Sequence, residues 1–314
     1  MSAAAALVRV RDRWRGLKER LAPAQDDRPD WFRSAPFLAL HAALLLIPWL
    51  GFGTREALAF GGTYVVGMFA ITAGYHRCFS HRAFRTSRWF RFVLAFLAEA
   101  TFQKGVLWWS SQHRHHHRWS DRDEDVHSPL RSFWWSHVGW VLCNRANAVR
   151  GELVRDLARD PEIRWIDRWY LLPPLCVGSA FFAAGGLALL VGGYVLGVVV
   201  LFHATAAINS LAHLWGTRRY ATSDGSRNNL LLALLTFGEG WHNNHHHRPA
   251  SARQGVRWWE IDLTWYALRL LAAVGVVWDL RGGPTPRPRP GVSVPLRARA
   301  PETVRGAAAG RRSP

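Results

Sequence analysis

Histidine is concentrated in two short stretches of this 314-residue chain. "SQHRHHHRWSD", at 111–121, holds four histidines in five positions, and "EGWHNNHHHRP", at 239–249, is similar. Residues three and four apart share one face of a helix. Each stretch therefore presents an H-x-x-H-H set on one face: His113, His116 and His117, and His242, His245 and His246. By the same spacing, His115 and His247 are expected to point away from these sets.

Two further pairs lie beside apolar runs. His76 and His81 are five apart in "HRCFSH", so the helix must end or bend between them if both bind a metal, and Ser80 could assist that. Asn209 and His213, in "NSLAH", are four apart and share a helical face. Imidazole is a ligand for iron, zinc, copper and nickel, and a structural zinc site takes only four ligands. Nine candidate histidines therefore predict a nitrogen-rich centre with two metals.

The apolar segments that must position these side chains are long enough to cross a bilayer. Residues 36–52, 57–75 and 171–217 carry no Asp, Glu, Lys or Arg. A crossing needs about 20 apolar residues, so the first two runs fit one crossing each. The third fits two, with a turn at one of two Gly-Gly pairs, 185–186 or 192–193. The sequence predicts an all-α integral membrane protein with four transmembrane helices in two hairpins and a cytoplasmic helical cap that holds the metal site; the alternative is a large soluble all-α core.

The distribution of basic residues orients these hairpins. Lys and Arg fill the flanks of both hairpins, whereas Arg55 is alone at the tips. By the positive-inside rule, both termini and all the histidine sets lie in the cytoplasm. The expected organisation is a cytoplasmic N-terminal segment 1–33, transmembrane hairpin one 34–75, a cytoplasmic segment with histidine boxes one and two 76–170, transmembrane hairpin two 171–215, a cytoplasmic segment with histidine box three 216–280, and a disordered basic tail 281–314. Arg269 interrupts the apolar run at 262–280, which indicates a surface helix rather than a fifth crossing.

The net charge of +18 has a membrane explanation. Lys and Arg beside a bilayer are attracted by anionic lipid. Because the chain has no visible nucleic-acid-binding motif, we expect no nucleic-acid partner. The 18 Trp support the membrane interpretation, since Trp collects at bilayer interfaces. The 3 Cys are odd in number and widely spaced, which is typical of a reducing compartment without a disulfide framework.

These motifs resemble those of the membrane fatty acid desaturases of the stearoyl-CoA (delta-9) type. The resemblance runs from about residue 35 to about 280 and rests on "HRCFSHRAF", "QKGVLWWSSQHRHHHRWSD", "EDVHSPLRSFWWSHVGW", "NSLAH" and "GEGWHNNHHHRP". It implies a di-iron centre held by nine histidines: His76, His81, His113, His116, His117, His213, His242, His245 and His246. It also implies that Asn209 holds a metal-bound water. The residues of the second box are similar to those of bacterial members. This similarity implies a multi-pass protein of the inner membrane with a cytoplasmic active site.

The resemblance further implies an O2-dependent enzyme that introduces a cis double bond, at delta-9, into a saturated fatty acyl chain carried by CoA or by a membrane lipid. Gln103, Trp109 and Thr205 match the residues that kink the acyl tunnel. Ala206 stands where animal members have a Trp, so the bend that sets the double-bond position departs from theirs. No His-Pro pair of a fused haem domain occurs, so electrons are expected from a separate ferredoxin or cytochrome b5-like donor with its reductase.

Charged residues around the boxes have two interpretations. Asp121, Asp125 and Glu239 either hydrogen-bond the metal ligands or are ordinary solvated acids. His127 and His137 are expected to support the site or the fold rather than to bind metal. Five arginines are candidates for docking an acidic donor, for binding CoA phosphates or for anchoring to headgroups: Arg77, Arg82, Arg85, Arg88 and Arg91.

Two rival functions share parts of this pattern. A membrane di-iron hydroxylase of a lipid or alkane uses the same histidine arrangement, and the mass of the product distinguishes it from a desaturase. A histidine-rich metal transporter or sensor would place ionisable residues inside the spans, along the ion path. Here the spans contain only His41 and, deep in the last run, His203. The sequence therefore favours the desaturase.

Overall fold

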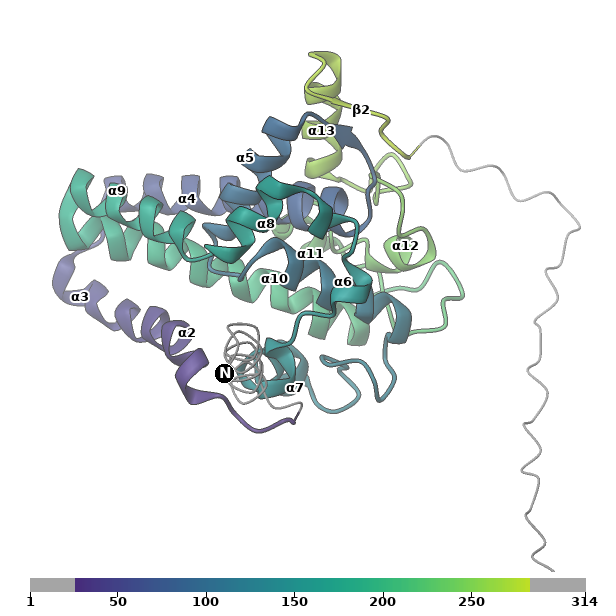
Figure 1. Cartoon of the computed structure of the whole chain (residues 1–314), viewed down its shortest axis with the longest axis horizontal. Helices are drawn as coiled ribbons and strands as arrows, with labels where there is room; N and C mark the ends of the chain where they lie inside the picture. The colour runs from purple at the N-terminus through teal and green to yellow at the C-terminus, as the bar shows by residue number, and fades with distance from the viewer. Residues whose placement is uncertain (1–25, 283–314) are drawn as a thin grey trace, which may run out of the picture. The chain divides into compact units, whose positions relative to one another are not determined.

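The computed structural model describes residues 26–282 (Figure 1). Most of the predicted cytoplasmic start and nearly all of the predicted disordered tail lie outside these residues. The helices are α2 (Trp31–Ala43), α3 (Ile47–Leu50), α4 (Thr54–Phe69), α5 (Arg88–Glu99), α6 (Val106–Trp119), α7 (Phe133–His137), α8 (Pro161–Arg168), α9 (Leu172–Ala188), α10 (Leu196–Leu214), α11 (Leu230–Leu235), α12 (His242–His247) and α13 (Leu263–Ala273). Two π-helices, Ala70–Ser80 and Leu189–Val195, continue α4 and join α9 to α10. The short strands β1 (Arg85–Thr86) and β2 (Val277–Trp278) pair antiparallel. The mostly helical class predicted from the sequence is confirmed.

Within the described part of the chain, three continuous helical segments are long and apolar enough to cross a membrane. They are Trp31–Leu50, Thr54–Ser80 and Leu172–Leu214. The last has 43 residues and is interrupted at one of the two Gly-Gly pairs proposed as a turn. Gly186 has φ +64°, a left-handed conformation that residues with a side chain rarely adopt. The chain therefore reverses at residues 185–186, and the other pair, 192–193, lies within a π-helix.

Helix α4 packs against α10 and the π-helix Leu189–Val195, and α9 packs back against the same π-helix. Close approach of α10 to α4 requires a small residue at Gly197, because a Cβ there would lie 2.6 Å from the methyl group of Thr63. At the predicted hairpin tips, the Arg55 guanidinium donates a hydrogen bond to the Ala184 carbonyl oxygen. Arg55, the one basic residue at the tips, thus links the start of α4 to the end of α9.

Helix α13 lies at the surface, as its central arginine indicates. It has 11 residues, too few to cross a bilayer. Asp262 begins the helix by accepting a hydrogen bond from the Trp265 backbone N–H at 2.9 Å. Leu268 is fully buried, whereas Leu270 and Val274 are exposed. The helix therefore packs one face on the protein and presents apolar side chains outward.

The largest buried apolar cluster surrounds the first π-helix. Ile71 and Phe79 of that helix pack with Leu94 of α5 and Leu268 of α13. Arg77 is also almost completely buried here. This core fixes the end of the π-helix, and with it the first two histidines.

Candidate metal centre

The first histidine pair lies at the end of the π-helix Ala70–Ser80. The helix ends at Ser80, between His76 and His81, as the sequence required, and the Ser80 hydroxyl donates to the Tyr75 carbonyl at 2.7 Å. The π winding was not predicted. The backbone N–H of His81 donates to the His76 carbonyl at 3.1 Å, and this i→i+5 pattern brings residues five apart to one face. The two ring centroids are consequently 4.9 Å apart.

Helix α6 carries the second histidine set and is anchored at its first turn. Glu99 and Asp167 accept hydrogen bonds from the first free backbone N–H groups of this helix, at 3.3 and 2.7 Å. Oxygen acceptors at a helix N-terminus satisfy N–H groups that have no partner within the helix. Arg114, between the histidines, donates to the Ser80 carbonyl at 2.9 Å. This bond ties α6 to the end of the π-helix and so aligns the first two histidine sets.

The nine predicted histidines come together in two clusters. In each cluster, one ring nitrogen of every member lies within 4.8 Å of those of the others. The five-histidine cluster is His76, His81, His113, His117 and His245, and the four-histidine cluster is His116, His213, His242 and His246. Each H-x-x-H-H set therefore divides, because the i, i+4 pair enters one cluster and the remaining histidine enters the other. Neighbouring rings connect the clusters, since the His117 and His246 centroids are 4.5 Å apart.

Ring nitrogens meet at ligand spacing in the five-histidine cluster. The Nε2 atom of His113 lies 2.7 Å from that of His81 and 3.0 Å from that of His117. The Nε2 atom of His245 lies 2.9 Å from that of His117 and 3.0 Å from that of His76. Two nitrogens bound at about 2.1 Å to one ion, at a right angle, would be about 3.0 Å apart. The spacing therefore fits a shared metal ion.

Carboxylates occupy the far side of three rings in the four-histidine cluster. Asp125 lies 2.9 Å from Nδ1 of His116, and Asp121 lies 3.0 Å from Nδ1 of His213. Asp224, which the sequence did not single out, lies 2.8 Å from Nδ1 of His246. A carboxylate at Nδ1 holds the proton there and leaves Nε2 with a free lone pair. The Nε2 atom of His246 is buried and has no hydrogen-bond partner in residues 26–282, which fits a metal ligand.

Glu239 performs the same role in the five-histidine cluster. Its Oε2 lies 2.5 Å from Nδ1 of His76, and its Oε1 accepts a hydrogen bond from buried Arg77 at 3.1 Å. Arg77 also pairs with Asp262 at 3.0 Å. Asp121, Asp125 and Glu239 therefore contact predicted metal ligands and are not ordinary solvated acids.

The electrostatics keep most of the histidines neutral. Burial, followed by the neighbouring rings, lowers the pKa well below the usual value in five of them: His81, His113, His117, His242 and His245. Burial also lowers the pKa of His246, to about 4. His116 differs: burial opposes its charged form, but Asp125 outweighs burial and raises the pKa of His116. Because a metal binds the neutral imidazole, the six histidines with a lowered pKa are prepared for metal at neutral pH.

The remaining box histidines do not enter the clusters. The His115 ring reaches the Glu124 carbonyl at 2.8 Å, and His247 stacks on Tyr220 with centroids 3.9 Å apart. Both therefore point away, as helical spacing predicts. His127 packs on His116 with centroids 4.4 Å apart.

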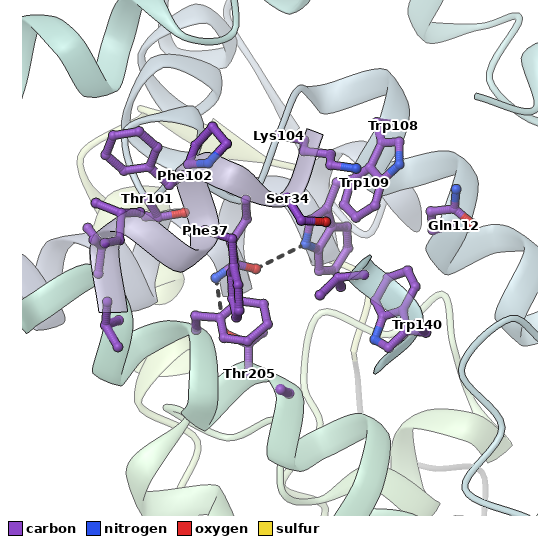
Figure 2. Close-up of a pocket in the computed structure, with 18 of the residues that line it drawn as sticks. Ser34, Phe37, Thr101, Phe102, Lys104, Trp108, Trp109, Gln112, Trp140 and Thr205 are labelled. Carbon is purple, nitrogen blue, oxygen red and sulfur yellow. Dashed lines mark hydrogen bonds between the residues drawn. The ribbon is translucent and has the colours of Figure 1, made fainter. Parts of the chain in front are cut away.

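A pocket between α2, α6 and α10 is lined in part by His113 of the five-histidine cluster. The three predicted tunnel residues line it and are joined by hydrogen bonds. Trp109 Nε1 donates to Gln103 Oε1 at 3.4 Å, and Gln103 Nε2 donates to Thr205 Oγ1 at 3.2 Å. Asn209 and His113 line the same pocket, and His113 stacks on Trp109 with centroids 5.1 Å apart. The pocket is otherwise largely aromatic and aliphatic, with Phe37 and Phe102 among its walls (Figure 2).

The five arginines considered for donor docking, CoA binding or headgroup anchoring are all in ion pairs. Arg77 is buried between Glu239 and Asp262, so none of these three roles holds for it. The other four pair near the surface: Arg82 with Asp156, Arg85 with Asp279, Arg88 with Glu162 and Arg91 with Asp160. Sequence reasoning missed these partners because they lie far away in the chain. Each pair reduces the positive charge that this face offers to a donor.

Comparison with known proteins agrees with this site. The family model described as fatty acid desaturase matches residues 55–279. The palmitoyl-monogalactosyldiacylglycerol delta-7 desaturase of Arabidopsis thaliana is 38% identical over 255 residues, covering 80% of this chain and 69% of that protein. The sn-2 palmitoyl-lipid 9-desaturase of Nostoc sp. (strain 36) is 35% identical over 263 residues, covering 82% and 92%. The icosanoyl-CoA 5-desaturase of Limnanthes douglasii is 37% identical over 252 residues, covering 78% and 70%. The chain therefore belongs to the fatty acid desaturase family, and it is an oxidoreductase of fatty acyl chains with membrane-length apolar helices.

Proposed function

We propose that this desaturase introduces a cis double bond at delta-9 into a saturated acyl chain of a membrane lipid, using O2 and two iron ions. The observation that carries the proposal is the largely apolar pocket between α2, α6 and α10, which His113 of the five-histidine cluster lines. The nine histidines are the proposed iron ligands, and Asn209 is proposed to hold a bound water. The relatives' names support the reaction, although they specify double bonds at delta-5, delta-7 and delta-9.

The protein's contribution is to hold the chain and the ligands. Iron bound in the two clusters would supply the oxidation of unactivated C–H bonds by O2, which no protein side chain can perform. The linked side chains Gln103, Trp109 and Thr205 would bend the acyl chain beside the clusters, so that one pair of methylenes lies nearest. Four carboxylates would fix the ligand rings through their Nδ1 atoms. The double-bond position then depends on the distance from the pocket mouth to this bend.

A lipid-linked substrate is supported by the helices that form the pocket. The wall at α2 and the wall at α10 both belong to membrane-length helices, so an acyl chain within the bilayer can reach the pocket from the side. The names of two of the three relatives also specify lipid-linked chains. Acyl-CoA is the alternative carrier, as in the Limnanthes relative.

We also propose the membrane arrangement expected from the charges. The reversal at residues 185–186 supports two crossings in Leu172–Leu214 and hence four crossings in two hairpins. Hairpin one is 34–75 and hairpin two is 171–215, with the cytoplasmic segments 1–33, 76–170 and 216–280 and the tail 281–314. Both clusters then lie at the cytoplasmic face of a bacterial inner membrane, where a ferredoxin or cytochrome b5-like donor can supply electrons.

The test is expression in a bacterial host that lacks its own desaturase, with a ferredoxin donor and its reductase, and with stearate supplied. Gas chromatography–mass spectrometry of dimethyl disulfide adducts locates any new double bond. Pulse labelling distinguishes the carriers, because the label appears first either in unsaturated phospholipid or in unsaturated acyl-CoA. A chain with 2 mass units less means desaturation, whereas one with 16 more means the rival hydroxylation. His116→Gln should abolish the product and His115→Gln should retain it; an inactive wild type or an active His116→Gln rejects the proposal.

A further inference from the structure

Three histidines outside both clusters form a hydrogen-bonded chain across three helices. His41 belongs to α2, His203 to α10 and His137 to α7. The Nε2 atom of His41 lies 3.0 Å from Nε2 of His203. The other nitrogen of His203, Nδ1, lies 3.1 Å from Nε2 of His137. Each nitrogen of the central ring therefore contacts a different histidine.

Carbonyl oxygens close both ends of this chain. The Nδ1 atom of His41 lies 2.7 Å from the Phe37 carbonyl oxygen. At the other end, Nδ1 of His137 lies 3.0 Å from the Ser210 hydroxyl, which lies 3.0 Å from the Ala206 carbonyl oxygen. A carbonyl accepts hydrogen bonds and donates none. The hydrogens of the chain must therefore come from its three rings and one hydroxyl.

Counting hydrogens shows that the neutral chain is one short. The chain contains five contacts: carbonyl to His41, His41 to His203, His203 to His137, His137 to Ser210, and Ser210 to carbonyl. Each contact needs one hydrogen, but three neutral imidazoles and one hydroxyl supply only four. Whichever tautomers are chosen, one contact has two facing lone pairs. A single added proton completes all five bonds and can be shared among the three rings.

The arrangement does not suit a third metal. The central ring uses its two nitrogens in opposite directions, so no three nitrogens of the chain converge. Among residues 26–282, none of these histidines belongs to a group of three or more His, Cys, Asp or Glu side chains whose ligand atoms lie within 4.8 Å of one another.

The chain lies beside the proposed reaction site. His41 lines the pocket that Asn209 and His113 also line. At the other end, His137 is half-buried and belongs to the segment 76–170, which is proposed to be cytoplasmic. A proton that moves along the chain therefore travels between this segment and the pocket wall at α2.

The proposed reaction consumes protons, and the inference rests on that proposed function. Two C–H bonds and the O–O bond break, while one carbon–carbon double bond and four O–H bonds form. The acyl chain is oxidised by two electrons, the external donor gives two more, and O2 is reduced by four to two waters. The acyl chain provides two of the four hydrogens, so two protons must come from solvent. We propose that His137, His203 and His41 relay these protons to the pocket, which His41 lines together with His113 and Asn209.

The central variant for testing the relay is His203→Gln. Glutamine keeps a donor and an acceptor, but it does not exchange a proton between them as imidazole does. Ser210→Ala is a smaller change that removes the hydroxyl in contact with Nδ1 of His137. His247→Gln is the matched control, because His247 stacks on Tyr220 outside both the chain and the clusters. The holoenzyme in nanodiscs, with its reduced donor and a saturated acyl substrate, is assayed for double bonds, electrons consumed, peroxide released, KM and iron content.

Both relay variants should lower kcat by about 10- to 100-fold, which is the order of effect expected when a positioned group no longer transfers a proton. Peroxide released per electron should rise several-fold, and the D2O effect on kcat should increase, with KM and iron content unchanged. The control should match wild type in every measurement. Thermal unfolding of His41→Phe, His203→Phe and the double variant tests the contact between these two rings without any turnover. The Tm shift of the double variant should differ from the sum of the two single shifts.

Unchanged peroxide yield and isotope effect in both relay variants would overturn the proposal, whether or not activity falls. A loss expressed only as a raised KM would assign the chain to holding α2 against α10 instead. If wild type makes no double bond, the proposed function fails and the relay with it, whereas the thermal cycle still reports whether the histidine chain exists.

Discussion

Asp125→Asn should remove metal from one cluster and leave the other loaded. Asp125 is fully buried. Its Oδ2 faces Nδ1 of His116 at 2.9 Å and accepts the Asp121 backbone N–H at 3.1 Å, while Oδ1 accepts the His127 backbone N–H at 3.3 Å. Burial opposes its ionisation, but His116 and then His127 hold the pKa of Asp125 well below its usual value. Asparagine keeps the shape and one oxygen but loses the charge that holds the His116 ring.

The size of the effect follows from that one bond. A hydrogen bond to a charged group contributes about 1.5–3 kcal/mol, which corresponds to about 10- to 100-fold in metal affinity. Changes in carboxylates behind metal ligands have effects of the same order. Among the described contacts, Asp125 touches His116 of the four-histidine cluster and no member of the other. Metal bound per chain should therefore fall from about two ions to about one at chelator concentrations where wild type keeps both.

The assay is a chelator series on the purified protein, with bound metal counted by mass spectrometry. Asp123→Asn is the matched control, since Asp123 is exposed, lies two residues away and loses the same charge. If Asp125→Asn keeps both metals as long as the control does, the carboxylate does not support the ligand. If it loses both metals together, the two clusters are not separate sites.

Three further outcomes are expected. His115→Gln should retain bound metal and product, whereas His116→Gln should lose the metal of the four-histidine cluster and the product. Equal losses in the two variants would contradict the assignment of His115 as a non-ligand. Burial lowers the pKa of His246 to about 4 in the folded chain, so as pH falls from about 6.5 to about 4 the unfolded chain takes up the proton before the folded chain does. The Tm of protein whose metal has been removed by a chelator should therefore decrease across that pH range, and a constant Tm would refute the reasoning. Gly186→Ala forces a side chain into φ +64° and should lower stability by about 1–2 kcal/mol, whereas Gly61→Ala, in open space on α4, should raise it by roughly 0.5–1 kcal/mol; thermal unfolding in detergent should give these opposite signs.

The histidine boxes could be predicted because helical spacing is local. His113, His116 and His117 share a face of α6, and His115 points elsewhere, as a period of 3.6 residues requires. The surface position of α13 was predictable from Arg269 for the same kind of reason, since one charge in a short apolar run disfavours a crossing.

The division of the histidines between two clusters was not predictable. Adjacent residues His116 and His117 enter different clusters, as do His245 and His246. Which neighbour faces which metal depends on how α6 and α12 are rotated against α10 and the π-helix, and one helix alone does not contain that information. Asp224 was missed for the same reason, because only folding brings its loop to His246.

The sequence by itself determined the long apolar segments, the helical class, the donor types and the family, because composition and short-range spacing specify these. The tertiary structure decided how nine histidines divide into two groups, which carboxylates hold them, that the docking arginines are paired, and that His41, His137 and His203 form a chain. These features depend on distances between residues far apart in sequence. Such distances arise from the packing of rigid helices, which no local pattern encodes.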